Sequence, residues 1–134
     1  MPMSVERFAA SVAGADALWE VVGDPARIPE WTDADRVEVL DEPVPGARVA
    51  VHRRERRTDW RLLTYGARAW EIERHGRVGW IGLGAKVVDE GERARLVLVG
   101  SLEPAGSRWR ARVVELPRIG AMLDRWACAA VDLA

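Results

Sequence analysis

Hydrophobic and polar residues alternate with a period of two along most of the chain. Val37 and Val39, for example, flank Glu38. This alternation is typical of strands that bury one face, because successive side chains of a strand point to opposite sides of the sheet. Turn-forming segments such as Pro43–Gly46 and Asp89–Glu92 separate the alternating runs. The pattern predicts strands over residues 4–12, 36–39, 49–54, 60–66, 70–75, 78–88 and 95–102.

Two short helices are predicted between the first strand and the second. Apolar residues recur at helical spacing in Asp16–Val22. Gly23 suits the left-handed conformation that often follows a last helical turn. Asp24 is a natural N-cap for a second short helix that ends near Trp31.

The C-terminal segment shows the clearest helical pattern. Its apolar residues share one stripe at a spacing of three or four, namely Ile119, Met122, Leu123, Trp126, Ala130 and Leu133. Pro117 is expected to start this helix, where its missing N–H costs little. Residues 109–116 are expected to form a separate turn or helix before it.

The segment after the first strand resembles a known family. Residues 11–31 read SVAGADALWEVVGDPARIPEW: a strand runs into a tryptophan-bearing helix, then Asp-Pro, then Pro-x-Trp. This order is similar to the START-like (SRPBCC) superfamily, and within it to bacterial polyketide cyclase/dehydrase and lipid-transport proteins. The resemblance extends less specifically over nearly the whole chain. Many relatives have proline where Ala15 stands here.

The resemblance implies an α+β helix-grip fold. In that fold a curved seven-stranded antiparallel sheet wraps around a long C-terminal helix, and two short helices follow the first strand. It also implies a cavity between the sheet and this helix, in a superfamily of carriers, hormone receptors, cyclases and partner-binding proteins. The strands after Thr58 are short for the family, which favours a small cavity over one for a large lipid. A shared fold leaves the chemistry open.

Composition and charge narrow the function classes. The chain has 134 residues, 49% of them hydrophobic, which fits a single domain over residues 1–134. The 20 basic and 21 acidic residues give a net charge of −1, so no strong field favours nucleic acid. Cys128 is the single cysteine, and His52 and His75 are the two histidines, too few for a metal site. No cofactor motif, signal peptide or membrane-spanning stretch is present, so we expect a cytoplasmic protein without cofactor, metal or membrane insertion.

Tryptophan supplies the candidate ligand-binding residues, since the chain has seven. Aromatic walls with a few polar groups are typical of a cavity for a planar apolar ligand. The predicted lining residues are Trp60, Trp70, Trp80 and Arg74 from the strands, with Met122 and Trp126 from the last helix. If Arg74 points inward, it needs a carboxylate or a ligand oxygen, because burying an unpaired guanidinium is costly. The alternative is a tightly filled core without a cavity.

The candidate acid–base residues are His52, Asp59 and Tyr65. His52 shares a face of its strand with Arg54, and both point to solvent if Val49 and Val51 pack inward. Asp59 and Tyr65 have the same parity on the next strand, from which they could bind or protonate a ligand carbonyl. A surface role for Asp59 is the alternative.

Three functions are consistent with these patterns. The first is a binding domain for a small, largely apolar, aromatic or polyketide-like molecule. The second is a polyketide cyclase or dehydratase that holds such a molecule in a reactive shape. The third is a protein-interaction module with a vestigial cavity. The partner of such a module could be a second copy of this chain. Ala121, Cys128 and Val131 lie opposite the core stripe of the last helix and leave an apolar patch that could pack in a homodimer.

Overall fold

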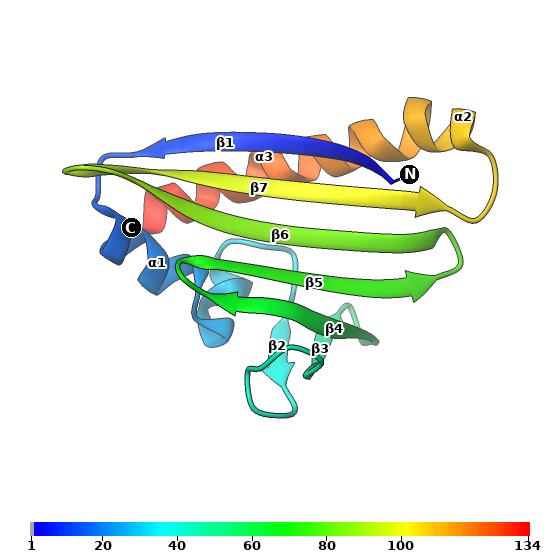
Figure 1. Cartoon of the computed structure of the whole chain (residues 1–134), viewed down its shortest axis with the longest axis horizontal. Coiled ribbons are helices and arrows are strands. Elements are labelled where there is room, and N and C mark those ends of the chain that lie inside the picture. Colours follow the sequence, from blue (N-terminus) through cyan, green and yellow to red (C-terminus); the bar gives the residue numbers. More distant parts are fainter. Residues whose placement is uncertain (1) are drawn as a thin grey trace.

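The strands form one seven-stranded antiparallel sheet in a computed structural model that describes residues 2–134. The strands lie side by side in the order β1-β7-β6-β5-β4-β3-β2, as predicted for a helix-grip fold (Figure 1). Their bounds are β1 (Met3–Ser11), β2 (Arg36–Val39), β3 (Arg48–Arg53), β4 (Arg56–Gly66), β5 (Ala69–Gly76), β6 (Gly79–Glu90) and β7 (Arg93–Pro104). β4 begins at Arg56 rather than near Trp60, because Arg54 and Glu55 form a tight turn with φ of 50° and 64°.

The helices lie at the ends and on one face of the sheet. Helix α1 (Ala15–Val22) and the 3₁₀-helix η1 (Pro25–Glu30) follow β1, as predicted. The C-terminal helix comprises α2 (Arg108–Arg110), the π-helical turn η2 (Ala111–Glu115) and α3 (Leu116–Leu133). It runs alongside β1 and β7, so the chain ends near α1 (Figure 1).

The main core lies between α3 and the β1–β7–β6 half of the sheet. Leu96, Leu123 and Ala127 are almost completely buried there. Glycines let the helix approach the strands closely. A Cβ at Gly100 would lie 2.5 Å from Ile119 Cγ2, and one at Gly120 would lie 2.7 Å from Arg7 Nη2. This half of the molecule is therefore packed by contact between small and branched residues.

The C-terminal helix is longer than the sequence pattern indicates. Residues 109–116 are part of one continuous helix instead of a separate element. Pro117 cannot donate a backbone hydrogen bond, and its ring crowds the carbonyl of the preceding turn. The π-helical turn immediately before it, in which Leu116 N–H donates to the Ala111 carbonyl, accommodates the proline without ending the helix.

The apolar stripe of this helix is rotated relative to the prediction at its C-terminal end. Leu133 is 40% exposed, whereas Ala127, outside the predicted stripe, is buried. Val131 packs partly against the core, so only Ala121 and Cys128 of the predicted outward patch are exposed. The apolar face available for the predicted homodimer is therefore smaller, and dimerisation stays a prediction.

Gly23 has a role different from the one predicted. Its φ is −89°, so it does not adopt the left-handed conformation. Glycine is required by space, since a Cβ at this position would lie 2.5 Å from the Trp19 ring. The predicted N-cap is confirmed: the Asp24 carboxylate accepts a hydrogen bond of 3.0 Å from Ala26 N–H.

Candidate functional site

A cavity of about 800 Å³ lies between the inner face of the sheet, the α3 helix and η1. Its walls are mainly apolar. The apolar side chains of the sheet wall include Val37, Val49, Val51, Leu62, Ile72 and Leu83. Ile28 of η1 and Trp31, the residue after η1, close the cavity on the η1 side. A space of this size differs from the filled core considered as the alternative from the sequence.

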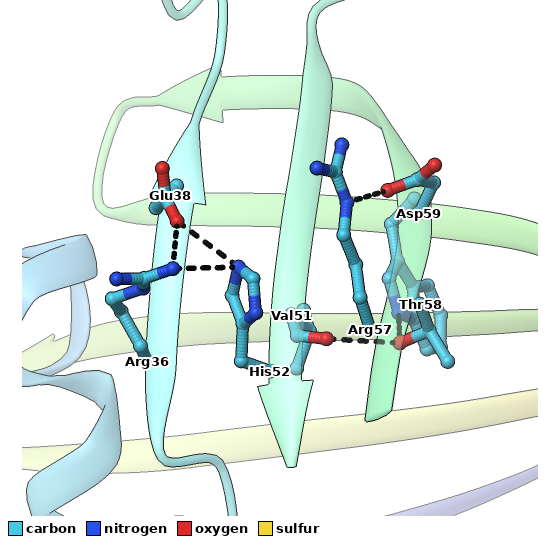
Figure 2. A network of polar contacts seen from close by, with 8 residues as sticks. Arg36, Glu38, Val51, His52, Arg57, Thr58 and Asp59 are labelled. Atoms are coloured by element: carbon cyan, nitrogen blue, oxygen red, sulfur yellow. Dashed lines mark hydrogen bonds and ion pairs between the residues drawn. The ribbon is translucent and has the colours of Figure 1, made fainter. Parts of the chain in front are cut away.

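The alternation of β3 decides where His52 lies. Val49 and Val51 line the cavity, so His52 points to the other face of the sheet. There its Nε2 lies 3.0 Å from Glu38 Oε1 and 3.3 Å from Arg36 Nη2, as Figure 2 shows. His52 is a member of a surface polar network and does not reach the cavity.

A β-bulge in β4 separates Asp59 from Tyr65. Thr58, Trp60 and Leu62 point into the cavity, but the pairing with β5 shifts between Leu62 and Thr64. The extra residue reverses the alternation, so Tyr65 also points inward although it shares its parity with Asp59. Asp59 is on the outer face, where its Oδ1 accepts a hydrogen bond of 2.8 Å from Arg57 (Figure 2).

Five of the six predicted ligand-binding side chains line the cavity: Trp60, Trp70, Arg74, Met122 and Trp126. Trp80 does not, because its neighbours Ile81 and Leu83 occupy the inner face of β6. The Trp80 ring lies on the outer face over Gly82, and its Nε1 donates to Glu73 Oε1 at 2.9 Å. The three strand tryptophans therefore do not share one concave surface.

Two cavity side chains join the sheet to the end of α1. Tyr65 donates its hydroxyl hydrogen to the Gly23 carbonyl at 2.7 Å, and Trp70 Nε1 donates to the Val22 carbonyl at 2.9 Å. The last carbonyls of a helix have no partner within the helix, so these bonds satisfy them. The Tyr65 hydroxyl is thus engaged in a structural bond.

Aromatic rings form the wall between η1 and α3. The rings of Trp31 and Trp126 meet edge to face with their centroids 6.4 Å apart. Trp31 is only 3% exposed. The pair closes this side of the cavity.

Arg74 is the charged side chain that enters the cavity from β5. Its guanidinium carbon lies 5.8 Å from the centre of the Trp60 ring, within cation–π range. The guanidinium also lies beside Gly76, where a Cβ would be 3.2 Å from Nη2. Among residues 2–134, no carboxylate lies within ion-pair distance of Arg74.

A second charged group lies at the rim between β3 and α3. Asp33 Oδ2 is 3.7 Å from Arg53 Nη2 and 3.9 Å from Arg125 Nη2. Asp33 and Arg53 both border the cavity. These long, exposed pairs connect the loop after η1 to the two walls and add little stability.

Glu73, an acidic residue with two hydrogen-bond donors around it, lies outside the cavity. Glu73 accepts hydrogen bonds from Trp80 and Arg61 on the outer face of β5. These two donors hold the pKa of the Glu73 carboxyl below its usual range. The Arg61–Glu73 pair joins adjacent strands across the outer face of the sheet, with the Glu73 side chain buried and Arg61 exposed.

Sequence reasoning missed several cavity residues. Trp31, Ile28 and Arg53 line the cavity but were not predicted to bind ligand. Trp31 carried a signal, because it ends the Pro-x-Trp segment on which the family resemblance rests. Arg53 shares its parity with Val49 and Val51, which was a second usable signal.

Comparison with known proteins agrees with this architecture. A START superfamily protein from Mycobacterium smegmatis is 14% identical, with a TM-score of 0.74 over 96% of this chain and 94% of that one. The chain has the START-like helix-grip fold. The Zhui aromatase/cyclase from a Streptomyces species is 20% identical, with a TM-score of 0.69 over 99% and 91%. A point mutant of norcoclaurine synthase from Thalictrum flavum is 14% identical, with a TM-score of 0.67 over 98% and 96%.

The START-like fold expected from residues 11–31 is therefore confirmed. No family model and no curated protein sequence matches the chain. Within residues 2–134, no helix is both long and apolar enough to span a membrane. The same residues contain no cluster of three or more His, Cys, Asp or Glu side chains arranged to hold a metal ion.

Proposed function

We propose that the chain binds a small, largely apolar molecule in the cavity between the sheet and α3. The observation that supports this proposal is the cavity itself, about 800 Å³ with mainly apolar walls. Ligand pockets in proteins typically measure about 300–1,000 Å³ and combine apolar walls with a few polar groups. Trp60, Trp126 and Arg74 provide that combination here.

The fold supports the same proposal by analogy. One similar structure, the norcoclaurine synthase point mutant, is a complex with a transition-state analogue. Another bears the name of an aromatase/cyclase. An aromatic or polyketide-like molecule is accordingly the ligand class that we propose.

The positions of the candidate acid–base residues favour binding over catalysis. His52 and Asp59 lie on the outer face of the sheet, and Tyr65 bonds to a helix carbonyl. A general acid or base must reach the reacting group within hydrogen-bond distance or through one water. We therefore place ligand binding first and the cyclase or dehydratase activity second.

A titration with N-phenyl-1-naphthylamine, an uncharged aromatic probe whose fluorescence rises in apolar sites, tests this proposal. We expect saturable binding at micromolar concentration. Ile72→Trp places a larger side chain in the cavity wall and should weaken binding about tenfold or more. The matched control is Glu71→Trp, which adds the same ring to the outer face of the same strand.

Two results would contradict binding in the cavity. One is the absence of saturable binding to the wild-type chain. The other is equal binding by the wild type, Ile72→Trp and Glu71→Trp, each shown to be folded by circular dichroism. In that case the probe occupies another surface, and the interaction-module hypothesis gains support.

A further inference from the structure

Arg74 is a half-buried cation of the cavity whose charge no carboxylate of residues 2–134 balances. It enters from β5 and has no carboxylate of residues 2–134 within ion-pair distance. Arg56 of β4 also borders the cavity without a carboxylate of residues 2–134 within ion-pair distance, but its side chain is exposed to solvent. Arg53 lies near Asp33 at the rim, and Arg61 is paired with Glu73 on the outer face. Arg74 thus combines a half-buried position in the cavity with the lack of a carboxylate partner.

Withdrawing a guanidinium from water without a counter-charge is unfavourable. The Trp60 ring recovers a part of this cost through the cation–π contact at 5.8 Å. The N–H donors of a guanidinium point outward in its own plane. The face of the Trp60 ring provides no hydrogen-bond acceptor in that plane. The planar donors of Arg74 therefore remain available to an anionic oxygen group, which they suit in geometry and charge.

The neighbourhood holds the guanidinium in place for such a contact. Trp60 lies on one side and the side-chain-free Gly76 on another, where a Cβ would be 3.2 Å from Nη2. Thr58 also lines this part of the sheet, but its hydroxyl already accepts a hydrogen bond of 3.0 Å from Trp60 Nε1. This hydrogen bond orients the indole that supports Arg74.

We propose that the ligand is an amphiphilic anion, an apolar aromatic body that bears an acidic oxygen group bound by Arg74 inside the cavity. This inference rests on the proposed function and specifies the class of ligand. The apolar walls contact the body of the ligand, and its carboxylate or equivalent group receives the N–H donors of Arg74. A neutral aromatic molecule of the same size leaves these donors without a charged partner and binds more weakly.

A matched pair of probes tests the inference. 8-Anilinonaphthalene-1-sulfonate carries an anionic group, and N-phenyl-1-naphthylamine has the same aromatic skeleton without it. We expect Arg74→Met to weaken binding of the sulfonate about tenfold or more while the uncharged probe changes less than about twofold. Arg74→Lys keeps the charge but loses the planar donors, so the sulfonate should weaken severalfold.

Arg57→Met is the control, because it removes the same charge from the outer face of β4. It should leave both probes within about twofold of the wild type, which excludes an effect of net charge alone. Circular dichroism and thermal unfolding establish that each variant is folded. If Arg74→Met does not fold, the inference is tested by the binding of the sulfonate to Arg74→Lys.

The outcomes separate this inference from the proposed function. If the uncharged probe binds but the sulfonate is insensitive to both Arg74 variants, the ligand class is wrong and cavity binding stands. Equal weakening of both probes by Arg74→Met, or equal loss of the sulfonate in Arg57→Met, also overturns the role of Arg74. If the wild type binds neither probe, the proposed function fails and this inference fails with it.

Discussion

The two halves of the sheet face the same helix but are filled in different ways. On one side, α3 lies against β1 and β7 (Figure 1). Inward residues of β7 such as Leu96 and Ala94 are buried there by direct packing. On the other side, inward residues such as Ile72 and Val51 border the cavity instead, and Leu83 of β6 borders it as well. The strands next to α3 belong to a packed hydrophobic core, whereas the strands farther from it form the wall of the cavity.

Side-chain size at the helix explains much of this difference. Gly120, Ala127 and Ala130 are the buried small residues of α3 and allow close approach to the strands. Met122 and Trp126 are large and line the cavity on the other side of the helix. Because protein interiors are packed to nearly crystalline density, an open space of this size has to be maintained by rigid surroundings. The comparison teaches that one helix can close a core along one side and keep a cavity open along another.

The largest expected effect is a loss of stability when a core residue on the packed side of the sheet is truncated. Leu96→Ala removes a side chain with no exposed surface and should lower the free energy of unfolding by about 2–5 kcal/mol. Ile72→Ala should cost less, about 1–2 kcal/mol, because part of Ile72 already faces the open cavity. Urea unfolding followed by circular dichroism measures both. Equal losses would mean that the two halves are packed alike.

A smaller effect tests how the cavity side is held together. Tyr65→Phe removes the hydroxyl that donates to the Gly23 carbonyl but keeps the ring, which lies 5.9 Å from the Trp19 ring between centroids. We expect a loss of about 1 kcal/mol in the free energy of unfolding, the usual net value of such a hydrogen bond. The same urea titration measures it, and Tyr65→Leu, which removes the ring as well, should cost more. A Phe variant as stable as the wild type would show that the bond to α1 contributes nothing.

The elements of the fold were predictable from local pattern, and the directions of several side chains were not. Strand alternation and the stripe around Leu123 identify the sheet and the last helix because burial on one face imposes a period. A period assigns residues to two faces without saying which face is inside. That is why Trp80 was placed with Trp60 although it lies on the outer face.

Two irregularities of the backbone account for other errors. The bulge near Leu63 reverses the alternation of β4, so Tyr65 enters the cavity while Asp59 does not. The π-helical turn at Ala111–Glu115 carries the helix through Pro117. Both depend on tertiary contacts of the neighbouring strand or helix, and a single sequence gives no periodic signal for one inserted residue.

The smallest predicted effect concerns the outer face of the cavity side and depends on pH. Hydrogen bonds from Trp80 and Arg61 hold the pKa of Glu73 below its ordinary value of 4.5 in the folded chain. A carboxyl with a lowered folded-state pKa stabilises the fold above about pH 4.5, and this contribution disappears as pH falls through the folded-state pKa. The stability difference between the wild type and Glu73→Gln should thus be constant near neutral pH and shrink below about pH 4.5. Urea midpoints between about pH 7 and pH 3 measure it, with Glu71→Gln on the same face of β5 as the control. A difference that stays constant over the whole range would show that the Trp80–Glu73–Arg61 network is not coupled to folding.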